Sequence, residues 1–321
     1  MRREAESSSR IEDTIATAEE VALYQAGYGE ARNEAVEVAN YLAALQHGLA
    51  SPLPISRRLI CEMHARLLDR VRGEDKRPGE IRTIQNQIGG RDDDAATARF
   101  VPPPPGEPLE RGLAAFERFV NAPPDHIPPM VAAALGHYQF EALHPFRDGN
   151  GRVGRVIATL TLCRQGLLEH PLVYVSGYFD RHRQRYYDLL LRVSTRGDWL
   201  AWIGFFLDAV IDQSKDAWGR IDGLRRLYDE QRASLQRGRA AGKSLALLDH
   251  LFSSPAVTAS SAQRALDTTD PTARAAIGRL VRSGMLTDLT GRDYGKVWLA
   301  RPILDIINMP SEIGAEPGAP V

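Results

Sequence analysis

Residues His144 to Arg155 read His-Pro-Phe-Arg-Asp-Gly-Asn-Gly-Arg-Val-Gly-Arg, and no other stretch of the 321-residue chain concentrates so much chemistry. His144 can accept a proton near neutral pH. Asp148 offers the single carboxylate that Mg²⁺ usually takes from a protein, with phosphate oxygens and water completing its shell. The stretch therefore combines a proton acceptor with a ligand for a hard metal ion.

The second half of the stretch has the composition of an anion-binding helix N-terminus. Gly149, Asn150 and Gly151 can adopt conformations closed to most residues, so their N–H groups can converge on an anion. Arg152 and Arg155 are spaced three residues apart at the start of an apolar-periodic run. A helix there would place both guanidinium groups on one face near its positive end, where phosphate is favoured. We therefore expect a site for nucleotide phosphates beside a base.

Each fragment of the stretch also has an ordinary structural interpretation. A histidine before proline often ends a helix, and Asp-Gly-Asn-Gly is a common turn. Arginines three residues apart usually lie on a solvated helix face. The functional interpretation is favoured because all of these features occur together within residues 144–155.

The stretch resembles the signature of the Fic family, His-Pro-Phe-x-Asp/Glu-Gly-Asn-Gly-Arg with a further arginine three residues on, and every fixed position is present. The resemblance extends over about residues 8–210. It implies a mainly α fold, a Fic-type helical bundle with a β-hairpin flap. It also implies transfer of AMP from ATP to a tyrosine, serine or threonine hydroxyl of a target protein, with Mg²⁺ or Mn²⁺.

The resemblance assigns roles to the first half of the motif. His144 would deprotonate the target hydroxyl, and Asp148 would hold the metal ion. Gly149, Asn150 and Gly151 would cradle the α- and β-phosphates.

It also assigns roles to the second half and to a later segment. Arg152 would neutralise the β-phosphate and Arg155 would take the γ-phosphate. Glycine at position 151 favours nucleotidyl transfer, because relatives resembling the Doc kinase carry lysine there and transfer a terminal phosphate. The family places adenine contacts near Tyr186 and Tyr187, for which core packing is the alternative.

A motif near the start of the chain, Ser8-Ser-Arg-Ile-Glu12-Asp13, resembles the inhibitory motif of Fic proteins, Ser/Thr-x-x-x-Glu-Gly/Asn. In the family this glutamate pairs with the second motif arginine, here Arg155, and so competes with the γ-phosphate for the same guanidinium fork. Asp13 departs from the family pattern and leaves the local geometry open. The alternative for Glu12 is an exposed helix glutamate. Relatives carry a further N-terminal segment, so the chain is expected to be a shortened one.

An alternating apolar and polar run starts at Gly79 and ends at a glycine pair and an acidic turn, Asp92 to Asp94, which predicts a β-hairpin. In Fic proteins such a hairpin is the flap that covers the site and binds a target segment by strand addition. The alternative is a solvent-exposed hairpin without a partner. The residues expected to dock the target are Arg82, Ile84, Gln85, Asn86, Gln87 and Ile88.

The remaining sequence is mostly helical in pattern. Helices are expected from Ser7 to about Gln25, over 29–47 and 56–71, and from Pro129 to His144. Trp199 and Trp202 follow helical spacing and are expected in the core. The predicted domains are N-terminal helices with the inhibitory motif (1–50), the Fic domain (51–210), a helical linker (211–242), a winged helix-turn-helix domain (243–305) and a disordered tail (306–321).

The C-terminal module is expected to contain three helices and then a hairpin. Asp270-Pro271 caps the third helix and Gly284 ends it. Between Arg264 and Lys296 six basic and four acidic residues leave a balance of only +2, whereas phosphate contacts need concentrated positive charge. DNA binding through residues 243–300 therefore stays open beside a packing or dimerisation role.

The composition limits the class of protein. A hydrophobic content of 43% and a charged content of 25% are ordinary for a soluble protein. The net charge of −1 gives no general attraction to nucleic acid or membrane. Cys61 and Cys163 form no disulfide framework or metal motif. Residues 1–20 are charged, and no window is apolar enough for a membrane span, so a cytoplasmic location without membrane contact is expected.

Three functions compete. The first is an AMP transferase restrained by Glu12, acting on a target protein and also on itself. The second is a DNA-binding regulator whose Fic domain is a sensor or idle. The third is removal of AMP from a modified protein by the same site. The intact motif argues against an idle site, and a homodimer stays open.

Overall fold

The computed structural model describes residues 1–26, 32–89, 98–236, 242–290 and 295–309. The chain divides into two compact units: unit 1 contains Met1–Ile15 and Val36–Ser214, and unit 2 contains Ala16–Ala35 and Lys215–Val321. This division into two units differs from the five predicted segments, whose boundaries remain a proposal.

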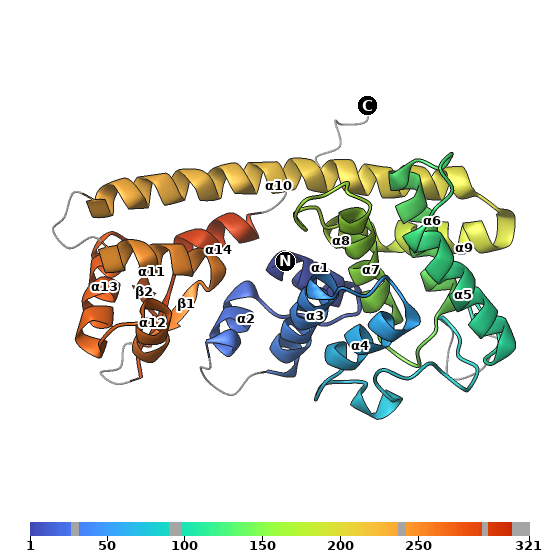
Figure 1. Ribbon diagram of the computed structural model, residues 1–321, viewed down its shortest axis with the longest axis horizontal. Helices are drawn as coiled ribbons and strands as arrows, with labels where there is room; N and C mark the ends of the chain where they lie inside the picture. The colour runs from blue at the N-terminus through green and yellow to red at the C-terminus, as the bar shows by residue number, and fades with distance from the viewer. Residues whose placement is uncertain (27–31, 90–97, 237–241, 291–294, 310–321) are drawn as a thin grey trace, which may run out of the picture. The chain divides into compact units, whose positions relative to one another are not determined.

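Unit 1 is a bundle of helices, which confirms the mainly α prediction (Figure 1). Helices α6 and α7 pack against each other, and α1 packs against α8 and α7. Its elements are α1 (Arg2–Ile11), most of α3 (Asn33–Ala50), α4 (Arg57–Leu67), the 3₁₀ helix η1 (Glu74–Lys76), α5 (Glu107–Asn121), α6 (Pro129–Leu143), α7 (Asn150–Arg164), α8 (Ser176–Arg181), α9 (Arg183–Arg196) and the first part of α10 (Trp199–Gln236).

Aromatic side chains fill much of the core of unit 1. Phe179 stacks on Tyr186 with ring centroids 4.5 Å apart, and the buried Trp202 donates its indole N–H to the carbonyl oxygen of Ala134 (2.9 Å). Trp199 was also expected in the core, but it is 41% exposed. It is the first residue of α10 and lies at the edge of the cluster.

Two helices replace the single one expected from Ser7 to Gln25. Helix α1 ends at Ile11, and Asp13 has a φ of +62°, which a continuing right-handed helix does not allow. Helix α2 (Ala18–Gln25) starts afresh at a capping box formed by Thr17 and Glu20.

Helix α1 buries a mainly polar face. Glu4 is 1% exposed and accepts hydrogen bonds from the hydroxyl groups of Tyr41 (2.9 Å) and Ser176. Other buried residues of α1 are Ala5, Glu6, Ser7, Ser8, Ser9 and Ile11. Burial raises the pKa of the Glu4 carboxyl. The helix is therefore held by hydrogen bonds and ion pairs more than by apolar area.

The expected hairpin is reduced to one isolated antiparallel bridge between Ile88 and Phe100 among the described residues. Their backbones exchange two hydrogen bonds, of 2.9 and 3.1 Å. The acidic turn at Asp92 to Asp94 lies outside the described residues. The segment before Ile88 is irregular because polar groups there bind the motif loop, as described below.

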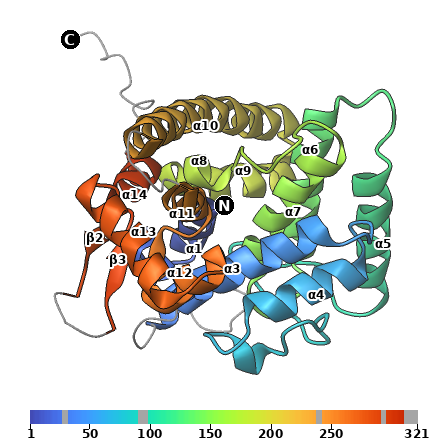
Figure 2. The same ribbon diagram turned by 60° about the vertical axis from the view of Figure 1, so that its left-hand side comes forward.

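Unit 2 contains α2, the later part of α10, α11 (Gly242–Ser253), β1 (Ala256–Thr258), α12 (Ala259–Leu266), α13 (Asp270–Arg282), β2 (Thr287–Asp288), β3 (Val297–Leu299) and α14 (Arg301–Asn308) (Figure 2). The strands form an antiparallel sheet in the order β1-β3-β2, with Val257 opposite Trp298. The expected order of three helices and a hairpin is present, with β1 added. The winged-helix assignment itself remains a prediction.

The boundaries of unit 2 differ in detail from those expected. Thr269, not Asp270, is the N-cap of α13, and Gly284 follows that helix with a φ of +76°. The predicted tail begins inside α14, which ends at Asn308. Residues 310–321 of that tail and residues 237–241 of the predicted linker lie outside the described residues.

Replacing Trp202 with alanine should destabilise unit 1 by about 3–5 kcal/mol, because it removes a fully buried indole and leaves the Ala134 carbonyl without its partner. Trp199→Ala is the matched control, since its ring is 41% exposed; a loss of about 1 kcal/mol is expected there. Chemical denaturation of both variants measures the difference. Equal losses would contradict this account of the core.

Candidate active site

A cavity of about 440 Å³ in unit 1 brings most of the predicted site residues together. It lies between the motif at the start of α7, the end of α1, the segment around Ile88 and helix α9. Its predicted members are Glu12, Gln87, Ile88, His144, Asp148, Gly149, Asn150, Gly151, Arg155, Tyr186 and Tyr187.

His144 is the C-cap of α6 and has a φ of +46°, an unfavourable conformation for a residue with a Cβ. Its carbonyl oxygen accepts hydrogen bonds from Arg82 Nε (2.9 Å) and Asn86 Nδ2 (3.2 Å), which hold it there. Its Nδ1 lies 3.3 Å from the carbonyl oxygen of Glu141. That contact favours a proton on Nδ1 and leaves Nε2 as the proton acceptor.

Arg82 is 3% exposed, so the expectation that it docks a target is wrong for this residue. Its guanidinium group donates to the carbonyl oxygens of His144, Ile84 and Leu143 and to that of Pro103. These contacts use four of the five N–H donors of the guanidinium group inside the protein. Arg82 therefore holds the backbone of the motif at His144 by hydrogen bonds.

The other expected flap residues divide into two groups. Asn86 supports the motif loop by donating to the carbonyl oxygens of His144 and Phe146, and Gln85 Nε2 donates to those of Asn86 and Pro102. Gln87 and Ile88 line the cavity, and Ile84 is 52% exposed.

The anion-binding loop leads directly into α7. Gly149 is the N-cap with a φ of +75°, a conformation that suits glycine. The Asn150 side chain accepts from Phe146 N–H (2.8 Å) and donates to the Phe146 carbonyl (2.9 Å), so it fixes the loop. The first backbone N–H groups of α7 have no partner within the helix and lie at the cavity. This geometry is compatible with the predicted anion site, which stays a prediction.

His64 supports the same loop, although sequence reasoning missed it. Its ring stacks on Phe146 at 3.7 Å and 2°. Its Nδ1 accepts from Gly79 N–H (2.8 Å), so Nε2 carries the proton that it donates to the Asp148 carbonyl (2.9 Å). His64 lies 84 residues before Asp148, and only the fold brings them together.

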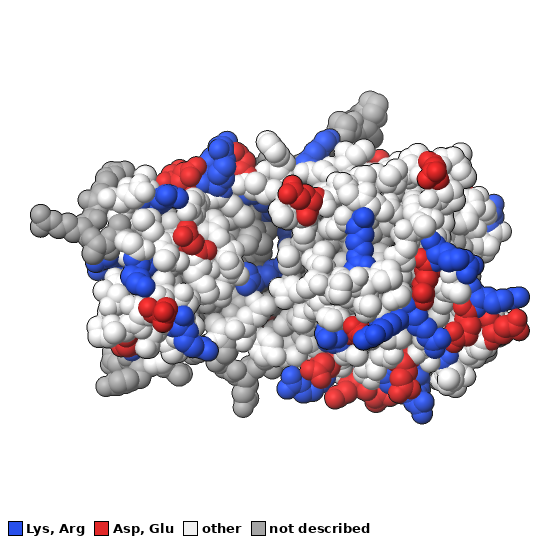
Figure 3. Space-filling view, in the orientation of Figure 1, with Lys and Arg blue, Asp and Glu red and all other residues white. Residues whose placement is uncertain are grey.

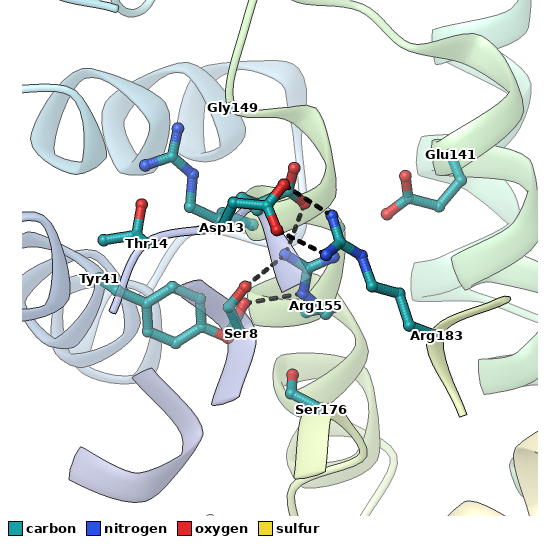
Figure 4. A network of polar contacts seen from close by, with 12 residues as sticks. Ser8, Asp13, Thr14, Tyr41, Glu141, Gly149, Arg155, Ser176 and Arg183 are labelled. Carbon is teal, nitrogen blue, oxygen red and sulfur yellow. Dashed lines mark hydrogen bonds and ion pairs between the residues drawn. The ribbon is translucent and has the colours of Figure 1, made fainter. Parts of the chain in front are cut away.

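Arg155 is 1% exposed and is bound by the end of α1 (Figure 4). Its Nε donates to Ser8 Oγ (2.8 Å), and its Nη2 donates to the Ser8 carbonyl (2.9 Å) and to Glu12 Oε1 (2.9 Å). Burial opposes ionisation of Glu12, but the charge and hydrogen bond of Arg155 outweigh it and lower the pKa of this carboxyl. The contact expected between Glu12 and Arg155 is present.

The αL conformation at Asp13 accounts for the family pattern at this position. Glycine and asparagine adopt a φ of +62° most easily, and aspartate is next best. The Asp13 carboxylate also accepts from both terminal nitrogens of Arg183, at 2.7 and 3.0 Å (Figure 4). The substitution by aspartate therefore does not hold Glu12 away from Arg155.

Gly151 permits the close approach of this ion pair. A Cβ at position 151 would lie 2.5 Å from Glu12 Oε1 and 2.9 Å from Arg155 Nη1. Any larger residue must displace one of the two groups.

Arg152 is also 1% exposed, and a carboxylate that sequence reasoning missed binds it. Its Nη1 donates to Glu37 Oε2 (3.2 Å), and its Nη2 lies 3.8 Å from Asp148 Oδ1. Both motif arginines are therefore buried and paired rather than solvated.

Asp148 presents a carboxylate at the cavity. Its side chain is 38% exposed and lines the cavity, and Oδ1 accepts from Gly149 N–H (2.6 Å). Within the described ranges no group of three or more histidine, cysteine or acidic side chains forms a metal site. One accessible carboxylate fits an ion whose other ligands are phosphate oxygens and water.

The two tyrosines differ. Tyr186 is 1% exposed, stacks on Phe179, and its hydroxyl lies 2.9 Å from His137 Nε2, so it is a core residue that reaches the cavity wall. Tyr187 is half-buried beside it on that wall.

The chain is similar to known proteins of one family. Residues 54–162 match the Fic/DOC family, and residues 1–50 match its N-terminal region. The chain is 33% identical over 155 residues to the protein adenylyltransferase Fic of Culex quinquefasciatus, covering 48% of this chain and 27% of that protein. It is 30% identical over 179 residues to that of Drosophila melanogaster, covering 55% and 32%. The chain thus spans about a third or less of the length of these relatives.

Solved structures show the same fold. A Fic family protein from Desulfovibrio desulfuricans G20 superposes with a TM-score of 0.57 at 21% identity, covering 93% of this chain and 87% of that one. Fic-1 from C. elegans superposes with a TM-score of 0.53 at 24% identity, covering 69% and 63%. Residues 1–50 and 54–162 thus carry the two regions of the Fic/DOC family. No helix among the described residues is both long and apolar enough to cross a membrane.

The pKa of His144 should be measurable by NMR titration of its ring. Burial lowers this pKa from 6.5 to about 4, and the charge of Glu12 partly opposes the shift. The neutral imidazole should therefore persist from pH 8 down to about pH 5 and gain its proton near pH 4. Glu12→Gly should lower the midpoint further. His144→Ala identifies the signal, and a midpoint near 6.5 would contradict the burial of this ring.

Proposed function

We propose that this protein transfers AMP from ATP to a tyrosine, serine or threonine hydroxyl of a protein, and that Glu12 restrains the reaction. One observation carries the proposal: His144, the N-terminus of α7 and the paired Arg155 all line one cavity. A base and a phosphate site in one cavity provide both parts of a transfer to a hydroxyl group.

The residues suggest an order of events. Arg155 would bind the γ-phosphate once Glu12 leaves, and the N–H groups at the start of α7 would bind the inner phosphates. Asp148 would hold Mg²⁺ or Mn²⁺, which supplies charge neutralisation on the phosphates. His144 Nε2 would take the proton of the target hydroxyl. The hydroxyl oxygen would then bond to the α-phosphorus, and the bond to the departing pyrophosphate would break.

The comparisons support transfer of AMP over transfer of a phosphate. The curated relatives are named protein adenylyltransferases. A side chain at Gly151 would collide with the ion pair of Glu12 and Arg155, so the lysine of the kinase-like relatives does not fit this arrangement. Self-modification and a homodimer are compatible with this proposal.

DNA binding by residues 243–300 is less favoured. Arg274 is paired with Asp270 at 2.7 Å, and Lys296 with Asp288 at 3.0 Å. Basic and acidic side chains are also interspersed over the face in Figure 3. A nucleic-acid site needs concentrated positive charge.

A cytoplasmic location is supported by the two free thiols, Cys61 and Cys163.

Glu12→Gly should raise labelling of protein by α-labelled ATP at subsaturating ATP by about one to two decades. A charge-assisted hydrogen bond of roughly 1.5–3 kcal/mol no longer competes for Arg155. The double variant Glu12→Gly with Arg155→Ala should lose this gain. Equal labelling by wild type and Glu12→Gly, both folded, would show that Glu12 does not restrain the site.

His144→Ala in the Glu12→Gly background should reduce transfer by about 10²–10⁴-fold while ATP binding persists, because the phosphate contacts remain. Incubation with α-labelled and γ-labelled ATP in parallel identifies the reaction. Only the α label should appear on protein. Incorporation of the γ label would indicate phosphorylation, and release of AMP from a pre-labelled target without incorporation would indicate the reverse activity.

A further inference from the structure

We infer that Glu37 is a positioning residue that holds the guanidinium group of Arg152 with one edge turned toward the phosphates. The inference rests on the proposed function, because it gives a buried carboxylate of α3 a part in binding the nucleotide. Glu37 lies 115 residues before Arg152 in the chain, and it belongs to no part of the motif.

The contact between the two residues is buried. Glu37 is 4% exposed and Arg152 is 1% exposed. Arg152 Nη1 donates to Glu37 Oε2 at 3.2 Å. The same oxygen accepts from the Thr14 hydroxyl at 2.8 Å, so the carboxylate is anchored from a second side. A buried arginine held at Nη1 can turn little about its remaining bonds.

The opposite edge of the guanidinium group lacks hydrogen bonds to the described residues. Arg152 Nε is buried and has no hydrogen-bond partner among the described residues. Nη2, which shares that edge, lies 3.8 Å from Asp148 Oδ1, beyond hydrogen-bonding distance. A buried N–H group without an acceptor lowers stability. A bound anion that accepts a hydrogen bond from Arg152 Nε would remove this cost. Two parallel N–H groups match the oxygens of a phosphate.

Arg152 does not itself line the cavity, but this edge faces Asp148, which does. Arg152 is in the first turn of α7, directly after Gly149, Asn150 and Gly151, and its Nη2 is turned toward Asp148 on the cavity wall. A phosphate at the helix N-terminus would therefore meet both the backbone N–H groups and this edge. Glu37 occupies Nη1 and leaves that approach clear.

The two motif arginines have carboxylate partners of different kinds. The Glu12 side chain is 33% exposed and stands at the end of a helix held by polar contacts, so a nucleotide can replace it. The Glu37 side chain is 5% exposed and lies within the long helix α3. It is built to remain when the nucleotide binds. Glu12 would compete with the nucleotide for Arg155, whereas Glu37 would orient the guanidinium group of Arg152 that binds it.

The test uses the full chain carrying Glu12→Gly, so that inhibition does not obscure binding. Titration calorimetry with ATP in the presence of Mg²⁺ gives Kd, and labelling gives KM and kcat. Glu37→Gln keeps the size of the side chain and removes its charge. We expect Kd and KM to rise roughly tenfold with kcat changed by less than threefold, as for loss of one oriented charged contact. Glu110→Gln, the same substitution at a carboxylate whose side chain is 47% exposed, is the matched control and should change Kd by less than twofold.

A variant pair separates positioning from general stability. In an Arg152→Met background, Glu37→Gln should have no further effect on Kd, because the group that it orients is gone. A lower melting temperature with unchanged Kd would overturn the inference and make Glu37 structural. Tighter binding or faster labelling by Glu37→Gln would overturn it in the other direction and make Glu37 a second inhibitor. If the Glu12→Gly parent binds no ATP, the proposed function fails and the inference fails with it.

Discussion

Two positive charges are buried in the first two turns of α7, and the rest of the site is arranged to compensate them. Arg152 and Arg155 are each 1% exposed, and a guanidinium group is not neutralised in a protein interior. Each must have a carboxylate, a carbonyl or a phosphate within reach. Glu37 from α3 meets this need for one, and Glu12 with the Ser8 carbonyl meets it for the other.

This requirement explains why distant segments converge on α7. The end of α1 turns at Asp13 so that Glu12 reaches Arg155, and the left-handed conformation there makes the turn. Gly151 carries no Cβ because the ion pair occupies that space. An empty phosphate site would leave Arg155 buried and uncompensated, and the protein supplies its own anion instead. The proposed restraint of the site and the compensation of the buried Arg155 charge therefore rest on one contact, between Glu12 and Arg155.

The sequence predicted the parts of the site that lie within one short stretch. His144, Asp148 and the glycine loop lie within one short stretch of sequence, so their chemical roles can be predicted from residue type and spacing. The pairing of Glu12 with Arg155 came from the family resemblance. Glu37 and His64 could not be found in this way, because each reaches the motif only after α3 and α4 have packed. The assignment of Arg82 failed for a related reason. A polar residue in an alternating run is expected to be exposed, but the Arg82 side chain is buried because it donates to the carbonyl oxygen of His144.

The polar face of α1 has a consequence for handling and evolution of the protein. Most helices that leave a core expose an apolar stripe and so promote aggregation. Glu4, Glu6 and Ser7 to Ser9 form most of what α1 buries. The surface it would uncover includes the hydroxyl groups of Tyr41 and Ser176. Water can take over these contacts on both sides. Separation of α1 from the bundle would therefore expose mainly polar surface, apart from the contacts of Ala5 and Ile11.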